Sequence, residues 1–198
     1  MRYDTDHKAK TRERVLVEAA KAIRRDGPNN VGVAEVMKQA GLTHGGFYAH
    51  FASKDELVAE AIGQMFKESG QRLARETAGQ RDPAKALGAY IDFYLSAAHR
   101  DARESGCALP FLSADAPRLP EASRQRYAQG VGWLTEAIAT LLTSSGLAEA
   151  EAAASSAVAE MVGALALSRA EPDPIASDAI LARSKRAVKQ RLALEQDQ

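Results

Sequence analysis

Apolar residues recur along the chain at spacings of three and four, which is the pattern of helices that bury one face. No stretch shows the sustained two-residue alternation of a half-buried strand. The pattern therefore predicts an all-α protein with about nine helices. The predicted helices cover residues 6–26, 33–40, 43–50, 53–77, 83–100, 104–114, a segment that ends at 145, 148–170, and a last segment from about 177.

Two of these helices are very short and are separated only by Gly41 and Leu42. Short helices joined by a tight turn and followed by a long helix are typical of a helix-turn-helix, whose second short helix enters the DNA major groove. Met37 on the first short helix can pack against Phe47 and Phe51 from the second. The order of elements therefore predicts a DNA-binding unit at the start of the chain.

Capping signals mark the helix starts around this turn. Thr43 is a good N-cap for the second short helix, whose free amides and positive dipole end suit a phosphate. Ser53 and Glu56 fit a capping box at the start of the long helix. Gly45 and Gly46 each cost about 1 kcal/mol inside a helix relative to Ala. We attribute this pair to close approach of the backbone to DNA.

The charge of the chain limits the classes of protein to which it can belong. The 26 Lys and Arg balance the 26 Asp and Glu, so the formal net charge is zero, which argues against a protein that coats nucleic acid by bulk charge. The balance is uneven, because the residues up to Lys54 include ten basic side chains against six acidic ones. The N-terminal quarter is therefore the electropositive end.

We expect a soluble, cytoplasmic protein with no membrane partner. The single Cys107 cannot form an intramolecular disulfide, and the first residues lack the apolar segment of a secretory signal. The best apolar stretch, residues 158–167, is interrupted by Glu160 and Gly163 and is shorter than the roughly 18 residues that a membrane span needs.

Residues 12–20, 40–51 and 53–57 together resemble the DNA-binding domain of TetR-family transcriptional regulators. The resemblance is specific, because several short elements recur in order at the family's spacing. It implies a three-helix DNA-binding domain with a helix-turn-helix over residues 1–52. A helical effector-binding and dimerisation domain is expected over residues 53–198.

The resemblance also implies which residues meet DNA. They are Arg12, Thr43, His44, Gly45, Gly46, Tyr48 and Lys54. We expect Thr43, Tyr48 and Lys54 to contact backbone phosphates. His44 and the two glycines are expected to face the groove, and Arg12 or the tail before it to touch the adjacent backbone or the minor groove. Gly46 stands where the family commonly has Thr, Ser or Ala, so an operator sequence cannot be carried over.

Simpler interpretations exist for some of these residues. Tyr48 is alternatively a core residue, and Lys54 a solvated cation. We interpret His50 as a hydrogen-bonded support for the segment rather than as a reader of bases.

The family resemblance further implies a small-molecule effector site in the middle helices, where aromatic residues cluster. The candidate residues are Phe93, Tyr94, His99, Cys107, Phe111, Tyr127 and Trp133. Together they can line an apolar cavity with a few polar anchors, whereas each aromatic alone is also explained by core packing. Cys107 is either a small buried apolar residue or a thiol sensor.

No catalytic or metal-binding constellation is visible. His44 and His50 are six residues apart, whereas a spacing of three or four would place them on one helix face. We therefore expect no enzyme activity, metal or cofactor.

The sequence thus predicts a ligand-responsive transcriptional regulator. We expect a repressor that binds a pseudo-palindromic DNA operator as a homodimer, formed by its last two helices, and that a small-molecule effector releases. The alternatives are a transcriptional activator, and an all-α ligand carrier or enzyme that uses the helix-turn-helix only structurally.

Overall fold

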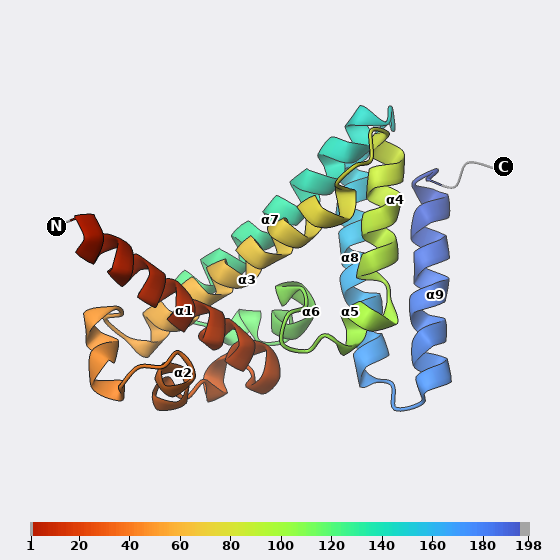
Figure 1. Cartoon of the computed structure of the whole chain (residues 1–198). Helices are drawn as coiled ribbons and strands as arrows, with labels where there is room; N and C mark the ends of the chain where they lie inside the picture. Colours follow the sequence, from red (N-terminus) through yellow and green to blue (C-terminus); the bar gives the residue numbers. More distant parts are fainter. Residues whose placement is uncertain (1, 195–198) are drawn as a thin grey trace. The chain divides into compact units, whose positions relative to one another are not determined.

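The computed structural model describes residues 2–194, with side chains from residue 7 onward (Figure 1). Within this range it contains nine α-helices, three 3₁₀-helices and no strand, which confirms the all-α prediction. The elements are α1 Arg2–Asp26, η1 Pro28–Asn30, α2 Val33–Gln39, η2 His44–Ala49, α3 Lys54–Thr77, α4 Pro83–Tyr94, α5 Ala97–Asp101, α6 Ala108–Leu112, η3 Ala116–Arg118, α7 Glu121–Ser144, α8 Ala150–Ala170 and α9 Pro174–Arg191.

Residues 83–100 form two helices, α4 and α5, instead of the single helix predicted. Leu95 leaves the helical conformation at φ −99° and ψ 52°, and α5 begins after Ser96. The Ser96 hydroxyl accepts from the amide of His99 at 3.1 Å and donates to the carbonyl of Phe93 at 2.6 Å. The serine therefore caps a new helix and ends the previous one.

Other predicted boundaries shift as well. α1 begins at Arg2 rather than at residue 6, and α6 begins at Ala108 because the extended Cys107, with ψ 138°, precedes it. α9 begins three residues before the predicted start. Asp173 accepts from the Ile175 amide at 3.0 Å, and the intervening proline needs no amide partner at the first helical position.

The chain divides into two compact units. Unit 1 holds the described residues up to Glu68 together with Cys107–Gln129, and unit 2 holds Ser69–Gly106 and the described residues from Gly130 onward. Two of the three boundaries fall within α3 and α7, so these two helices contribute residues to both units. The predicted division into a DNA-binding domain up to residue 52 and an effector-binding domain from residue 53 stays a prediction. The two compact units are defined by how the chain packs, not by what each part binds.

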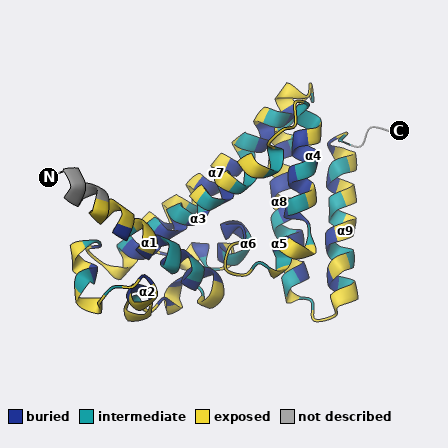
Figure 2. Cartoon of the chain, in the orientation of Figure 1, coloured by how far each residue is buried: buried dark blue, intermediate teal, exposed yellow. Residues whose placement is uncertain are grey.

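Unit 1 has one hydrophobic core. The buried face of α1 meets α2, η2, the first part of α3 and α6 there, as the dark blue segments in Figure 2 show. Ile23, Met37, Phe51, Leu57 and Ile62 are among its fully buried side chains. The predicted packing of Met37 with Phe47 and Phe51 in one core is confirmed.

Unit 2 is built around the hairpin of α8 and α9, which lie side by side, with α4 and α5 packed against it (Figure 1). The hairpin buries Met161 and Leu165 of α8 against Leu181 and Val188 of α9. α8 is rich in Ala and Ser, and its length and mean hydropathy of 1.3 reach those of a membrane-spanning helix. A third of that window is buried inside the protein, and core helices of soluble proteins pass the same test.

Two of the ion pairs that link α1 to α3 within unit 1 differ in burial. Arg24 Nη2 lies 2.7 Å from Glu68 Oε2, and the Arg24 side chain is only 1% exposed. Lys67 Nζ donates to Glu13 Oε1 at 2.6 Å, but both of these side chains are about half exposed. A buried guanidinium depends on its carboxylate far more than an exposed ammonium does.

We therefore expect Glu68→Gln to lower the free energy of unfolding by about 3 kcal/mol, because the buried charge of Arg24 loses its carboxylate. Glu13→Gln is the matched control on the exposed pair and should change stability little. Urea denaturation of the two variants and the parent chain measures both effects. Equal losses for the two variants would contradict the assigned difference in burial.

Candidate nucleic-acid interface

The second short helix of the predicted helix-turn-helix is a 3₁₀-helix, η2, rather than the α-helix expected for residues 43–50. Thr43 occupies its N-cap position with extended φ −82° and ψ 151°, but its side chain makes no capping hydrogen bond. Instead, the Thr43 carbonyl accepts from the amide of Gly46 at 3.1 Å. The expected side-chain cap is therefore wrong, because the tighter 3₁₀ turn satisfies this amide through the backbone.

Two phenylalanines fix which face of η2 is exposed. Phe47 and Phe51 are buried, and their rings stack with centroids 5.7 Å apart. Tyr48 meets Phe47 edge to face at 5.2 Å but is 74% exposed, so it is not a core residue. Thr43 and His44 are exposed as well. The buried rings thus leave a phenol, a hydroxyl and an imidazole on the outer surface of the segment.

The paired glycines of η2 are not required by the fold of the chain itself. A Cβ at Gly45 would meet nothing within 4 Å, and one at Gly46 would lie 3.8 Å from Met37 Cε, an ordinary contact. Neither glycine adopts a positive φ, whereas Gly41 in the preceding turn has φ 72°. That close approach of DNA explains the two glycines stays a prediction. Crowding inside unit 1 does not explain them, because a Cβ at either position has room.

Lys54 is the first residue of α3 and is exposed. Its Nζ donates to the Asn29 carbonyl at 2.9 Å, which holds the ammonium at the surface. The capping box forms as predicted at one end, where Ser53 Oγ accepts from the Glu56 amide at 3.1 Å. The Glu56 carboxylate reaches back to the amide of Ala52, at 2.6 Å, one residue before the N-cap. These bonds fix the start of α3 and hence the position of Lys54.

Arg12 is engaged within unit 1 more fully than the sequence suggests. Its guanidinium lies 3.1 Å from a carboxylate oxygen of Glu60 and 3.6 Å from one of Glu56. Its Nε donates to the His50 carbonyl at 3.4 Å, and its Cζ lies 4.7 Å from the centre of the Phe51 ring. The DNA contact of Arg12 stays a prediction, while its contacts here tie α1 to the end of η2.

His50 follows η2 and has a supporting position. Burial lowers the pKa of its imidazole, and the nearby cations Lys8 and Arg12 lower it further. The ring is therefore neutral at neutral pH and does not present a positive charge to a phosphate. His50 supports the segment through its carbonyl, which accepts from Arg12, whereas the expected side-chain hydrogen bond is wrong, because its Nδ1 is buried with no hydrogen-bond partner among the described residues.

Other exposed cations lie in the same compact unit and were not singled out from the sequence. They are Lys8, Lys10 and Arg14 on α1 and Lys38 in the last turn of α2. The surplus of basic residues near the N-terminus is the one signal that points to them. Their side chains add positive charge to the unit that carries η2.

The predicted effector residues fall into two groups, one in each compact unit. In unit 2, the His99 ring is buried, stacks on Phe93 at 4.8 Å and lies 2.8 Å from the Tyr94 carbonyl through Nδ1. The Arg72 guanidinium covers the Phe93 ring at 4.6 Å. Trp133 is 36% exposed. Phe93, Tyr94 and His99 are thus brought together. Arg72 is a further neighbour that the sequence did not indicate.

In unit 1, the group consists of Cys107, Phe111 and Tyr127. Cys107 is buried, which fits a small apolar residue. Burial raises the pKa of the Tyr127 phenol, a hydrogen bond to Ser113 partly offsets this shift, and the ring meets Phe66 at 6.4 Å. The effector role of both groups stays a prediction.

Within the described residues, no group of three or more His, Cys, Asp or Glu side chains is placed to hold a metal ion.

The sequence matches a known family model, described as bacterial regulatory proteins of the tetR family, over residues 15–61. The HTH-type transcriptional regulator LmrA of Bacillus subtilis (strain 168) is 28% identical over 82 residues. That alignment covers 41% of this chain and 44% of the relative, so the match spans less than half of the relative's length.

Solved structures share the fold over nearly the whole chain. A TetR transcriptional regulator from Chloroflexus aurantiacus J-10-FL has a TM-score of 0.81 at 24% identity, covering 95% of this chain and 96% of that one. The reduced form of E. coli NemR has a TM-score of 0.79 at 22% identity, covering 91% and 96%. LmrA and the Chloroflexus aurantiacus protein are both described as transcriptional regulators, and at 24% and 22% identity the two solved structures show a shared fold.

Because the fold does not require Gly46, we expect Gly46→Ala to keep or raise the free energy of unfolding, by up to about 1 kcal/mol. Gly41→Ala is the control. Its positive φ should make the same added methyl group cost about 1–2 kcal/mol. Thermal denaturation compares the two variants. A loss at Gly46 as large as that at Gly41 would mean that the chain itself needs this glycine.

Proposed function

Because the chain belongs to the TetR family of bacterial regulatory proteins, we propose that it is a transcriptional repressor that binds a pseudo-palindromic operator as a homodimer. A small-molecule effector releases it from DNA. We also propose that it acts in the cytoplasm, where its operator is accessible.

The observation that carries this proposal is the outer surface of η2. A segment anchored by two buried phenylalanines exposes Thr43, His44 and Tyr48 beside the ammonium of Lys54. Hydroxyl and ammonium groups contact phosphates, whereas an imidazole can donate to or accept from a base edge. His44 is the one residue of η2 with an exposed side chain that suits base reading, so it is our candidate base reader.

Exposed apolar groups on the hairpin of α8 and α9 support the homodimer. Leu167 on α8 is 63% exposed and Ile175 on α9 is 81% exposed. α8 also exposes small residues, including Ala152 and Ala159, which permit close packing of a second helix. A two-fold dimer of this kind presents two copies of η2, which suits half-sites about 34–36 Å apart.

α3 provides the route for effector control in this proposal, because it contributes Lys54 to unit 1 and Arg72 to unit 2. An effector held by the Phe93, Tyr94 and His99 group favours a state in which α3 has shifted. The two copies of η2 are then wrongly spaced for the operator. Effector and DNA weaken each other's binding reciprocally, by a coupling of typically about 1–3 kcal/mol.

Selection of random duplex DNA by the purified protein, at one stated salt concentration, tests the proposal. We expect the bound pool to be enriched in one pseudo-palindrome, which then provides the operator for effector screening and transcription assays. Salt-sensitive binding without enrichment would instead favour a ligand carrier that uses its helix-turn-helix only structurally.

Lys54→Ala should weaken binding to every duplex and flatten the slope of log affinity against log salt by about two units for the dimer, because each of its two chains then neutralises one phosphate fewer. Lys85→Ala removes the same charge from an exposed position on α4 and should leave the slope unchanged. Titrations at several salt concentrations measure both slopes. If the two variants behave alike, Lys54 does not contact a phosphate.

A further inference from the structure

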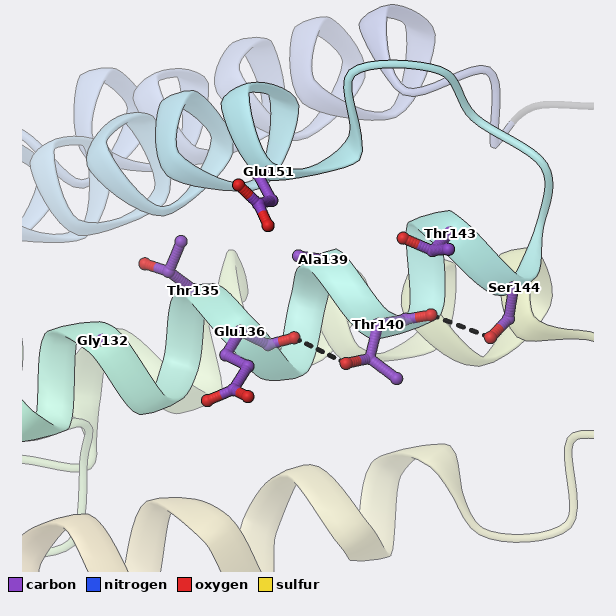
Figure 3. A pocket seen from close by; sticks show the side chains of 8 residues that line it. All are labelled: Gly132, Thr135, Glu136, Ala139, Thr140, Thr143, Ser144 and Glu151. Atoms are coloured by element: carbon purple, nitrogen blue, oxygen red, sulfur yellow. Dashed lines mark hydrogen bonds between the residues drawn. The ribbon is translucent and has the colours of Figure 1, made fainter.

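A groove of about 640 Å³ lies between the second half of α7 and the start of α8, within unit 2. Figure 3 shows Glu151 directed from α8 toward the turn of α7 that carries Thr135. Glu136 and Thr140 line the groove further along α7. The lining contains two carboxylates and no basic side chain.

Three of the four hydroxyl groups that line the groove already donate to their own helix. Thr135 donates to the Val131 carbonyl at 3.0 Å, and Thr140 donates to the Glu136 carbonyl at 2.9 Å (Figure 3). These hydroxyl groups therefore offer acceptors to an occupant, as the two carboxylates do. A matching occupant supplies donors and positive charge.

The exposed face of α9 carries groups of this kind. Arg183 and Arg186 are one turn apart and exposed, and neither forms an ion pair with any other residue that the structure describes. The basic residues on the other faces of α9 are paired. Lys185 and Lys189 lie 3.8 and 2.8 Å from carboxylate oxygens of Asp92, and Arg191 lies 2.7 Å from one of Glu160.

We propose that the groove receives α9 of a second copy of this chain, with the partner's Arg183 and the partner's Arg186 facing Glu136 and Glu151. This inference rests on the proposed homodimer. It identifies the contact that fixes how the two chains align along their helices. A two-fold interface forms the contact twice, once on each side of the axis.

The hairpin geometry fits this arrangement. α8 and α9 run antiparallel, joined by the short segment Glu171–Asp173, so the start of α8 and the end of α9 lie at the same end of the hairpin (Figure 1). With the two-fold axis along the hairpin, the second half of the partner's α9 reaches the end of α8 that carries Glu151. The groove also adjoins the exposed small residues of α8, such as Ala152 and Ser155, that we assign to the dimer.

Two charge-reversed chains test the contact. The first carries Glu136→Arg and Glu151→Arg, and the second carries Arg183→Glu and Arg186→Glu. In a homodimer of either variant, like charges face each other in both copies of the contact. The dissociation constant of that homodimer should therefore rise about tenfold or more. In a mixture, a chain of each kind restores opposite charges on both sides of the axis. Sedimentation velocity should then show a heterodimer with near-parental affinity.

Recovery on mixing also shows that both variants fold. Arg75→Glu with Arg81→Glu is the control, because it makes the same charge change at exposed positions outside the groove and α9. It should dimerise like the parent chain.

Three results would overturn the inference. If both reversed chains dimerise like the parent, the groove lies outside the interface while the proposed homodimer stands. If both are monomeric and their mixture stays monomeric, the charges do not face each other. If the parent chain itself is monomeric, the proposed homodimer fails and the groove contact fails with it.

Discussion

The burial of Phe47 and Phe51 is the constraint on which the outer surface of η2, the proposed DNA-binding surface, depends. η2 spans only His44–Ala49, contains two adjacent glycines and lacks a side-chain cap, so its own hydrogen bonds are too few to hold its shape. The two stacked rings attach it to the core that α1, α2 and the first part of α3 form. Every exposed side chain of the segment takes its direction from these rings.

Charged groups complete this attachment at the end of the segment. Arg12 reaches from α1 to the His50 carbonyl and to the face of Phe51, while Glu56 and Glu60 hold its guanidinium from α3. Glu56 has a second role, because it also satisfies the Ala52 amide before α3. One carboxylate thus links the start of α3 to α1. This is why Lys54 has a defined position although its side chain is exposed.

Most of the fold could be predicted from local signals. The capping box of Ser53 and Glu56 predicts the start of α3, and the order of short and long helices indicates the helix-turn-helix. The 3₁₀ form of η2 could not be predicted, since helical periodicity does not distinguish it from an α-helix over so few residues. The break at Ser96 could not be predicted either, because the sequence has no Gly or Pro there. Asp173 and Pro174 do signal the start of α9, three residues before the predicted one.

The candidate site was predictable where the residues belong to one short segment. Thr43, His44 and Tyr48 lie on or beside η2 and are exposed as expected. The partners of Arg12 could not be predicted, since Glu56 and Glu60 lie more than forty residues away in sequence. The groove on α7 was unpredictable for the same reason, because Glu136 and Glu151 belong to different helices. Only the packing of the helices brings such residues together.

In the proposed function, two copies of η2, carried by one dimer, bind one operator. The stoichiometry of the complex tests it most directly. Sedimentation of the protein with a labelled duplex that carries the full pseudo-palindrome should give two chains per duplex, and a duplex with one half-site replaced should bind far more weakly. A complex with a single chain, or equal affinity for the two duplexes, would show that η2 does not act in pairs on one operator.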